Sequence, residues 1–316
     1  MKLIRDLKEL PSELRGGAVS IGNFDGVHRG HARIVETLRA QAAAVGGPAL
    51  VFTFDPHPVR LLRPDEVPPP LTWADRKAEL IEELGVDGMI VYPTDENLLA
   101  LTPQEFFREI VVERLGARAM VEGPNFFFGK DRAGNIDVLR SLCSANEITL
   151  EVVPPLTIGG DYVSSSRIRR LIEVGDVGQA AEMLTRPYRI RGMVTHGAGR
   201  GAKIGFPTAN IDAIDTILPG TGVYAGAAYF SNQRWPAAVN IGPNPTFGED
   251  RLKVEAHLIG YSGSLYGQPL EVDFLRRVRE TRRFASVEDL QRQLAADVEE
   301  ATSIVEHRRK NKSFNA

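Results

Sequence analysis

The first half of the chain alternates short apolar runs with segments of helical periodicity. Apolar residues recur every three or four positions in three segments, which predicts amphipathic helices at 31–45, 75–84 and 103–115. Continuous apolar runs between them predict buried strands at 18–21, 50–54, 88–91, 119–121 and 148–153. Alternation of this kind predicts a parallel sheet with helices on both faces. A further helical stretch is expected over 166–184.

The pattern changes after about residue 186. Apolar runs punctuated by Gly and Pro predict strands at 188–194, 223–230, 235–241, 252–260 and 270–276. Five or six strands without intervening helices predict a small antiparallel barrel. Ser286 is a candidate N-cap for a closing helix over 287–307. We therefore expect two domains, 1–185 and 186–316.

Composition restricts the class of protein without naming a function. A length of 316 residues accommodates two domains, and a net charge of -3 gives no general attraction to nucleic acid or anionic membrane. We therefore expect no nucleic-acid partner and no membrane partner. The chain also lacks a secretory signal and an apolar run of 18 residues, which argues further against a membrane. Cys143 is the only cysteine, which excludes an intrachain disulfide and fits a cytoplasmic location.

The segment 22–31 combines glycines with two histidines where a strand leads into a helix. Gly22, Gly26 and Gly30 let backbone amides approach a phosphate closely, and a helix N-terminus adds partial positive charge. His28 and His31 can donate hydrogen bonds to phosphate oxygens. The pattern predicts a nucleotide-phosphate site, and it is not the Walker loop.

Two other interpretations of this segment stay open from the residues alone. The glycines could form only a tight turn, with the histidines as polar surface. Alternatively, a hydrolytic metal site is conceivable, with ligands drawn from Asp25, His28, His31, Asp55 and His57.

The segment 196–210 is the densest motif of the second half. Its glycines can wrap phosphates with backbone amides. Thr208 and Asn210 stand two residues apart, so an extended chain would point both side-chain oxygens the same way, toward a hard cation. The alternative is an ordinary Gly-rich hairpin loop with a turn at Pro207.

These motifs resemble those of the bifunctional riboflavin kinase/FAD synthetase family, and the likeness covers nearly the whole chain. His28-Arg29-Gly30-His31 is similar to the His-x-Gly-His signature of the nucleotidyltransferase superfamily. Further family segments are similar at 53–58, 122–129, 132–134 and 163–169, and then at 205–210, 240–248, 254–258, 265–267 and 279–284. Phe127 departs from the residues that many relatives carry. The resemblance implies an α/β Rossmann-like nucleotidyltransferase domain with a parallel sheet, followed by a small antiparallel β-barrel domain with a C-terminal helix.

For the N-terminal domain, the resemblance implies adenylyl transfer from ATP to FMN, which gives FAD and pyrophosphate. His28 and His31 are implied to act on the ATP phosphates. The other implied ATP contacts are Gly22, Asn23, Phe24, Asp25, Gly30, Ser164 and Arg167. The implied flavin contacts are Phe54, Pro56, Pro58 and Asn125.

For the C-terminal domain, the resemblance implies phosphorylation of riboflavin to FMN by ATP. Glu255 takes the place of the catalytic carboxylate, Thr208 and Asn210 are implied to bind Mg²⁺, and Arg279 is implied to contact flavin. The implied ATP contacts are Gly199, Gly201, Lys203, Gly205 and Pro207. The expected partners are thus riboflavin, FMN and ATP, with the enzyme a monomer or weak homo-oligomer. A kinase with an inactive N-terminal domain and a flavin-binding regulator are the competing functions.

Overall fold

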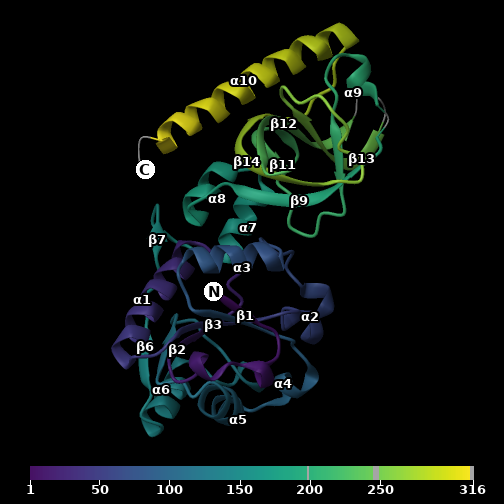
Figure 1. Ribbon diagram of the computed structural model, residues 1–316. Helices are drawn as coiled ribbons and strands as arrows, with labels where there is room; N and C mark the ends of the chain where they lie inside the picture. The colour runs from purple at the N-terminus through teal and green to yellow at the C-terminus, as the bar shows by residue number, and fades with distance from the viewer. Residues whose placement is uncertain (198, 245–248, 314–316) are drawn as a thin grey trace. The chain divides into compact units, whose positions relative to one another are not determined.

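The computed structural model describes residues 1–197, 199–244 and 249–313, and its contacts divide the chain into two units (Figure 1). The first unit comprises Met1–Pro68 and Trp73–Ser164, and the second comprises Pro69–Thr72 and Ser165–Ala316. The first unit contains a parallel sheet and the second a closed barrel, which confirms the predicted fold class.

A six-stranded parallel sheet forms the centre of the first unit. Its strands, in spatial order, are β1 (Lys2–Ile4), β4 (Gly88–Tyr92), β3 (Ala49–Phe54), β2 (Ala18–Ile21), β5 (Ala119–Glu122) and β6 (Thr149–Val152). The sequence did not predict β1, because three residues are too short to give a pattern. The strand order reverses between β2 and β5, and ligands of such sheets bind at the carboxyl ends of the strands beside this reversal.

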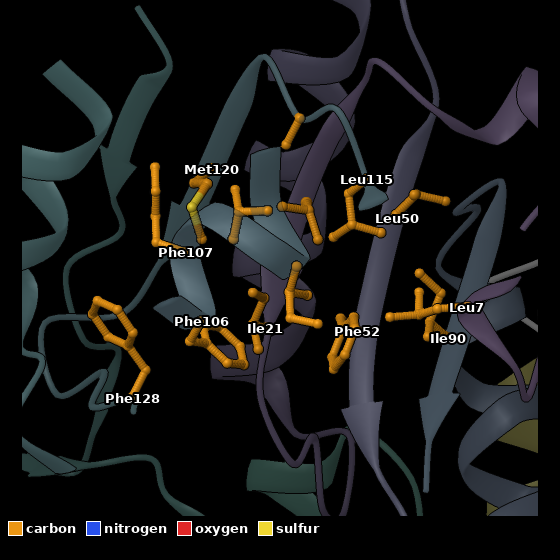
Figure 2. Close-up of a cluster of buried hydrophobic side chains, with 14 of the residues drawn as sticks. Leu7, Ile21, Leu50, Phe52, Ile90, Phe106, Phe107, Leu115, Met120 and Phe128 are labelled. Carbon is orange, nitrogen blue, oxygen red and sulfur yellow. The ribbon is translucent and has the colours of Figure 1, made fainter. Parts of the chain in front are cut away.

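Helices cover both faces of the sheet because its strands are apolar on both sides. Ala18, Val51 and Met89 pack in one cluster with α1 (Arg29–Val45) and α3 (Ala74–Glu83). Leu50 and Phe52 point the other way, into the cluster drawn in Figure 2. That cluster packs against α5 (Pro103–Phe106), the π-helical η4 (Phe107–Arg114) and α6 (Ile136–Ala145).

Shorter elements connect these layers. They are η1 (Leu7–Glu9), η2 (Ser12–Leu14), α2 (Val59–Leu62), η3 (Pro64–Glu66), α4 (Glu96–Ala100), η5 (Lys130–Arg132) and the hairpin of β7 (Thr157–Ile158) and β8 (Asp161–Tyr162).

The second unit is an antiparallel barrel closed by six strands. Their order is β10 (Ala209–Asp212), β13 (Glu249–Leu258), β12 (Gln233–Asn244), β11 (Gly222–Phe230), β14 (Pro269–Arg279) and β9 (Tyr188–Thr195). A single turn, α9 (Arg200–Lys203), precedes β10, and α10 (Val287–Ser313) lies along the barrel (Figure 1). Ser286 caps α10 as predicted, with its hydroxyl accepting from the Asp289 N–H at 3.1 Å.

One helical prediction was wrong. The stretch 166–184 is two helices, α7 (Ser165–Glu173) and α8 (Val177–Leu184), because Gly175 has a φ of 83° that ends the first. Since α8 packs on β9 and β14, contacts place both helices in the second unit. The assignment of activities to 1–185 and 186–316 stays a prediction. No helix among the described residues is both long and apolar enough to cross a membrane.

The two-unit division predicts separable unfolding. Phe52 is fully buried in the first unit, so we expect Phe52→Ala to lower the free energy of unfolding of that unit by about 3–5 kcal/mol. The chain has two tryptophans, Trp73 in the first unit and Trp235 in the second. In a Trp235→Phe protein the fluorescence of Trp73 follows urea unfolding of the first unit, and in a Trp73→Phe protein Trp235 follows the second.

With Phe52→Ala, we expect only the unfolding transition reported by Trp73 to shift to lower urea concentration. Leu62→Ala, at a side chain 59% exposed, is the control and is expected to change stability by less than about 0.5 kcal/mol. An equal shift of the Trp235 transition would contradict the division.

Candidate active sites

The loop between β2 and α1 follows an unusual path because two of its side chains are buried. Phe24 and Val27 are 3% and 5% exposed and pack in the cluster that includes α1 and β3. Their φ angles are 48° and 38°, and that of Gly26 is 82°. Left-handed backbone at a non-glycine residue costs about 1–3 kcal/mol. Burying each side chain contributes about 1.5–3 kcal/mol, so burial offsets the strain and fixes the loop.

The two histidines cap α1 reciprocally. His28 is the N-cap, His31 is the third helical residue, and their rings stack with centroids 3.6 Å apart. The His31 N–H donates to Nδ1 of His28 at 3.3 Å, and the His28 N–H donates to Nδ1 of His31 at 3.4 Å. Because both Nδ1 atoms accept, the proton of each neutral ring lies on Nε2, which is then a donor. Two donors at the positive end of a helix suit phosphate oxygens.

Three more predicted residues lie around these histidines. A Cβ on Gly30 would lie 3.0 Å from Cε1 of His28, so glycine leaves room for the ring. Asp25 is only 8% exposed. The side-chain oxygen of Asn23 is buried and has no hydrogen-bond partner within the part of the chain that the structure describes. A buried acceptor of this kind can accept a hydrogen bond from a ligand or from an ordered water.

The loop after β3 lies beside the loop after β2. The Thr53 hydroxyl, near the end of β3, donates to the Asn23 carbonyl at 3.2 Å and so joins β3 to the loop after β2. Phe54 is half-buried against the cluster of Figure 2, Pro56 follows a cis peptide bond, and Pro58 is the N-cap of α2. The predicted flavin contacts 54, 56 and 58 are therefore continuous with the strand edge that carries the predicted phosphate contacts.

The remaining predicted residues of this site are more dispersed. Asn125 is exposed beyond the end of β5, in a turn where the Phe126 N–H donates to the Gly123 carbonyl. Ser164 ends the first unit, whereas Arg167 lies in α7 of the second. A role of Arg167 at the phosphates stays a prediction.

Phe127 and Phe128 lie in different environments. Phe128 is 6% exposed in the core, whereas Phe127 is 46% exposed with the Arg132 guanidinium 4.7 Å from its ring centroid. The departure at Phe127 is therefore at the surface.

A buried carboxyl group joins β2 and β5 at the strand-order reversal. Glu122, 3% exposed, accepts a hydrogen bond from the Ile21 N–H at 2.7 Å, beyond the last paired residues of these strands, Val19 and Met120. Burial raises the pKa of Glu122 well above its usual value, although the bond from Ile21 opposes that rise. Neither the motifs nor the periodicity predicted this group.

The hydrolytic-metal alternative lacks a ligand set. Among residues 1–197, 199–244 and 249–313, no three His, Cys, Asp or Glu side chains are grouped so that they could hold a metal ion.

Strand register builds the second site. Asn210 of β10 and Asn240 of β12 are both directly opposite Glu255 of β13, so the three side chains form a row on one face. Val254, Ala256 and Leu258 alternate with this row and fill the barrel interior. The row therefore lies on the outer face of the barrel, where it lines a cavity together with Thr208, Gly199 and Gly201.

The Gly-rich segment passes very close to the predicted metal ligands. A Cβ on Gly197 would lie 2.1 Å from the Asn210 amide nitrogen, and one on Gly201 would lie 2.3 Å from the Phe206 carbonyl and 3.4 Å from the Thr208 hydroxyl. These close approaches require glycine at both positions. Ala198 lies outside the described residues, as do 245–248 of the segment 240–248.

Helix α10 closes the cavity on one side. Three apolar side chains of the helix line it, Leu290, Leu294 and Val298. Asp297 of the same helix is 2% exposed and accepts hydrogen bonds from the Arg279 guanidinium at 2.7, 2.9 and 3.1 Å. Arg279 also lines the cavity, but this ion pair fixes it to the helix. Lys203 is exposed on α9, and neither it nor Gly205 or Pro207 lines the cavity.

Known proteins share both halves of this architecture. A family model described as FAD synthetase matches residues 10–167, and one described as riboflavin kinase matches residues 184–305. A bifunctional riboflavin kinase/FMN adenylyltransferase from Pseudomonas fluorescens is 37% identical over 305 residues, which cover 96% of this chain and 98% of the relative. The chain belongs to the bifunctional riboflavin kinase/FMN adenylyltransferase family.

Another family member and a solved structure match nearly the whole length of the chain. The protein of the same description from Escherichia coli K12 is 33% identical, with 94% of this chain and 96% of the relative covered. A crystal structure described as a macrolide-efflux protein from Streptococcus pneumoniae superposes with a TM-score of 0.83 at 28% identity, covering 94% of this chain and 97% of the other. The family resemblance of the motifs is thus confirmed.

Three residues that line the barrel cavity were not predicted from the sequence: Asn240, His257 and Asp297. Asn240 begins a family segment, but the segment alone predicts no role for it. His257 follows Glu255 by two residues, a spacing that signals the same strand face, and its Nδ1 donates to the Pro207 carbonyl at 2.7 Å. Asp297 carried no signal, because an acidic residue on a charged helix is ordinary until its partner is known.

Glu122 gives a pH-dependent prediction for stability. Its pKa is raised in the folded state, so the folded protein binds more protons, and its stability falls as pH rises above the unfolded value near 4.5. Glu122→Gln does not titrate. We expect its stability advantage over the wild type to grow with pH, by up to about 1.4 kcal/mol per pH unit below the folded pKa.

Urea unfolding followed by Trp73 fluorescence between pH 5 and 8 measures this difference. Glu151→Gln, at an exposed side chain of β6, is the control and is expected to give a pH-independent difference. A Glu122→Gln difference that does not change with pH would show that the carboxyl group is ionised in both states.

Proposed function

We propose that this enzyme makes FAD from riboflavin in two ATP-dependent steps. The barrel phosphorylates riboflavin to FMN, and the α/β domain transfers the adenylyl group of ATP to FMN and releases pyrophosphate. The observation that carries this proposal is the row Asn210, Glu255 and Asn240, which faces one cavity together with the Gly-rich segment.

In the kinase step, Glu255 is the general base. A ribityl hydroxyl of riboflavin is too weakly acidic to ionise alone, so a carboxylate must take its proton as the oxygen attacks the γ-phosphorus of ATP. The phosphorus–oxygen bond to ADP then breaks in line. Amides at Gly199 and Gly201, which line the cavity, hold the nucleotide phosphates. Lys203, Gly205 and Pro207 belong to the same segment but do not line the cavity, so their contact with ATP stays a prediction.

The residues beside Glu255 fit Mg²⁺. Thr208 and Asn210 offer hard oxygen donors, and magnesium commonly takes one or two protein ligands while keeping water and phosphate oxygens. Both residues line the cavity next to the base. Magnesium bound there would neutralise negative charge on the transferred phosphate.

In the adenylylation step, an FMN phosphate oxygen attacks the α-phosphorus of ATP. No covalent enzyme intermediate is needed, so positioning and charge stabilisation supply the rate. The Nε2 donors of His28 and His31 and the amides at the start of α1 hold the ATP phosphates, and Asn23 accepts from the nucleotide. The loop of Phe54, Pro56 and Pro58, with Asn125, holds the flavin.

We further propose that the enzyme works in the cytoplasm as a monomer or weak homo-oligomer, without nucleic-acid or membrane partners. Its low net charge and single cysteine support this.

One incubation separates the candidate functions. With riboflavin, ATP and Mg²⁺, chromatography is expected to show FMN first, and then FAD and pyrophosphate. Accumulation of FMN without FAD would indicate a kinase with an inactive N-terminal domain. Bound flavin without any product would indicate a regulator.

Replacing Glu255 tests the kinase base. We expect Glu255→Gln to lower FMN formation at least about 10²-fold, because the amide cannot take the hydroxyl proton. FAD formation from added FMN is expected to stay within about twofold of the wild type. The control Glu299→Gln lies on the exposed face of α10 and is expected to leave both rates unchanged. Unimpaired FMN formation by Glu255→Gln would refute the base.

Replacing both histidines tests the adenylylation site. His28→Ser/His31→Gln keeps an N-cap and a capping box for α1 but removes both imidazoles, so folding is expected to be preserved. We expect FAD formation from FMN to fall at least about 10²-fold, while FMN formation from riboflavin continues. Undiminished FAD formation would remove the histidines from the reaction.

A further inference from the structure

One lysine outside all the motifs lies at the edge of the sheet where the adenylylation site is formed. Since β3 and β4 are parallel neighbours, the helix that connects them, α3, must begin at the carboxyl edge and run back along the sheet. Lys77 is in the first turn of α3, so it is at the same edge as the loops that follow β2 and β3.

The packing of α3 turns Lys77 toward these loops. Leu80 and Ile81, 4% and 0% exposed, share a hydrophobic cluster with Phe24 and Val27 of the loop after β2. Lys77 precedes them by three and four residues, which places it on the same face of the helix one turn nearer the carboxyl edge. Its side chain is accordingly half-buried, although lysine is ordinarily exposed.

Two carboxylates interact electrostatically with the ammonium group. Burial lowers the pKa of Lys77, and its interactions with Asp25 and Asp55 oppose that shift. Asp25 belongs to the loop assigned to ATP, and Asp55 belongs to the loop assigned to flavin. The packing of α3 and these two interactions together place Lys77 near both loops.

We propose that Lys77 is the cation that neutralises the phosphates of ATP and FMN as they react, and that Asp25 and Asp55 hold it at the junction of the two loops. The inference rests on the proposed adenylyl transfer. Two carboxylates beside a site that must admit two phosphate-bearing substrates would repel both of them, and one ammonium group removes much of that repulsion. Because the α-phosphorus of ATP and the phosphate of FMN must meet between their loops, a cation at the junction acts on the transition state more than on either ground state.

The first test separates charge stabilisation from substrate binding. In the full chain, we expect Lys77→Met to lower kcat for FAD formation from FMN about 10²- to 10³-fold, with KM for FMN and for ATP changed less than about fivefold. Lys77→Arg is expected to recover at least about tenfold of that loss. FMN formation from riboflavin stays unchanged in both variants. Lys8→Met, an exposed lysine of the same unit, is the matched control and keeps the wild-type rate.

A chemical test covers the case in which methionine disturbs folding. The only natural cysteine, Cys143, is 1% exposed, and burial raises its pKa to about 12, so it resists alkylation. Lys77→Cys can therefore be alkylated selectively. Bromoethylamine rebuilds a lysine-like amine and is expected to restore FAD formation at least about tenfold, whereas iodoacetamide adds a neutral group and restores nothing.

Three results would overturn the proposal. They are a Lys77→Met kcat within about threefold of the wild type, a loss confined to KM, and equal recovery by the two alkylating reagents. Because the histidine variant tests the adenylylation site independently, FAD formation that needs the histidines but not Lys77 would reject this inference alone. A wild-type enzyme that forms no FAD would reject the proposed function.

Discussion

The burial of Phe24 and Val27 decides the path of the chain between β2 and α1. Both side chains pack in the cluster between the sheet and helices α1 and α3, and both residues accept left-handed backbone to do so. The strain amounts to a few kcal/mol, which the buried area of two large apolar side chains offsets. The loop is consequently rigid, and its end carries the two capping histidines to a fixed place at the start of α1.

The barrel uses a different constraint for the same purpose. Residues alternate between the two faces of β13, so the apolar residues that fill the interior leave Glu255 and His257 on the outer face. Pairing with β10 and β12 then places an asparagine on each side of Glu255. The interactions that stabilise the barrel therefore also position the candidate base and metal ligands, with no separate loop needed to hold the carboxylate.

Buried charge is balanced differently in the two units. In the second unit, Arg279 and Asp297 form an ion pair with three contacts, and breaking one partner would leave the other charge buried. In the first unit, the raised pKa of Glu122 favours a neutral carboxyl group, whereas Asp25 and Asp55 stabilise the charge of Lys77 electrostatically. Each unit thus avoids an uncompensated charge beside the place where phosphates are expected to bind.

Local patterns along the chain predicted the fold class, most of the strands and helices, and the two motif regions. Hydrophobic periodicity is a local property, and the spacing of His28 and His31 or of Thr208 and Asn210 is readable along the chain. Periodicity did not separate α7 from α8, because the φ angle of a glycine within a helical pattern is known only from the folded chain.

Contacts between residues that are distant in the sequence depend on the folded arrangement of strands and helices. Four interactions join residues of separate elements. They are the pairing of Glu255 with Asn240, the hydrogen bond from Ile21 to Glu122, the ion pair of Arg279 with Asp297, and the electrostatic interaction of Lys77 with Asp25. Register, helix direction and packing set these contacts, and none of the three can be counted along the sequence. The residue types were therefore visible from the start, while their partners depended on how the strands and helices assembled.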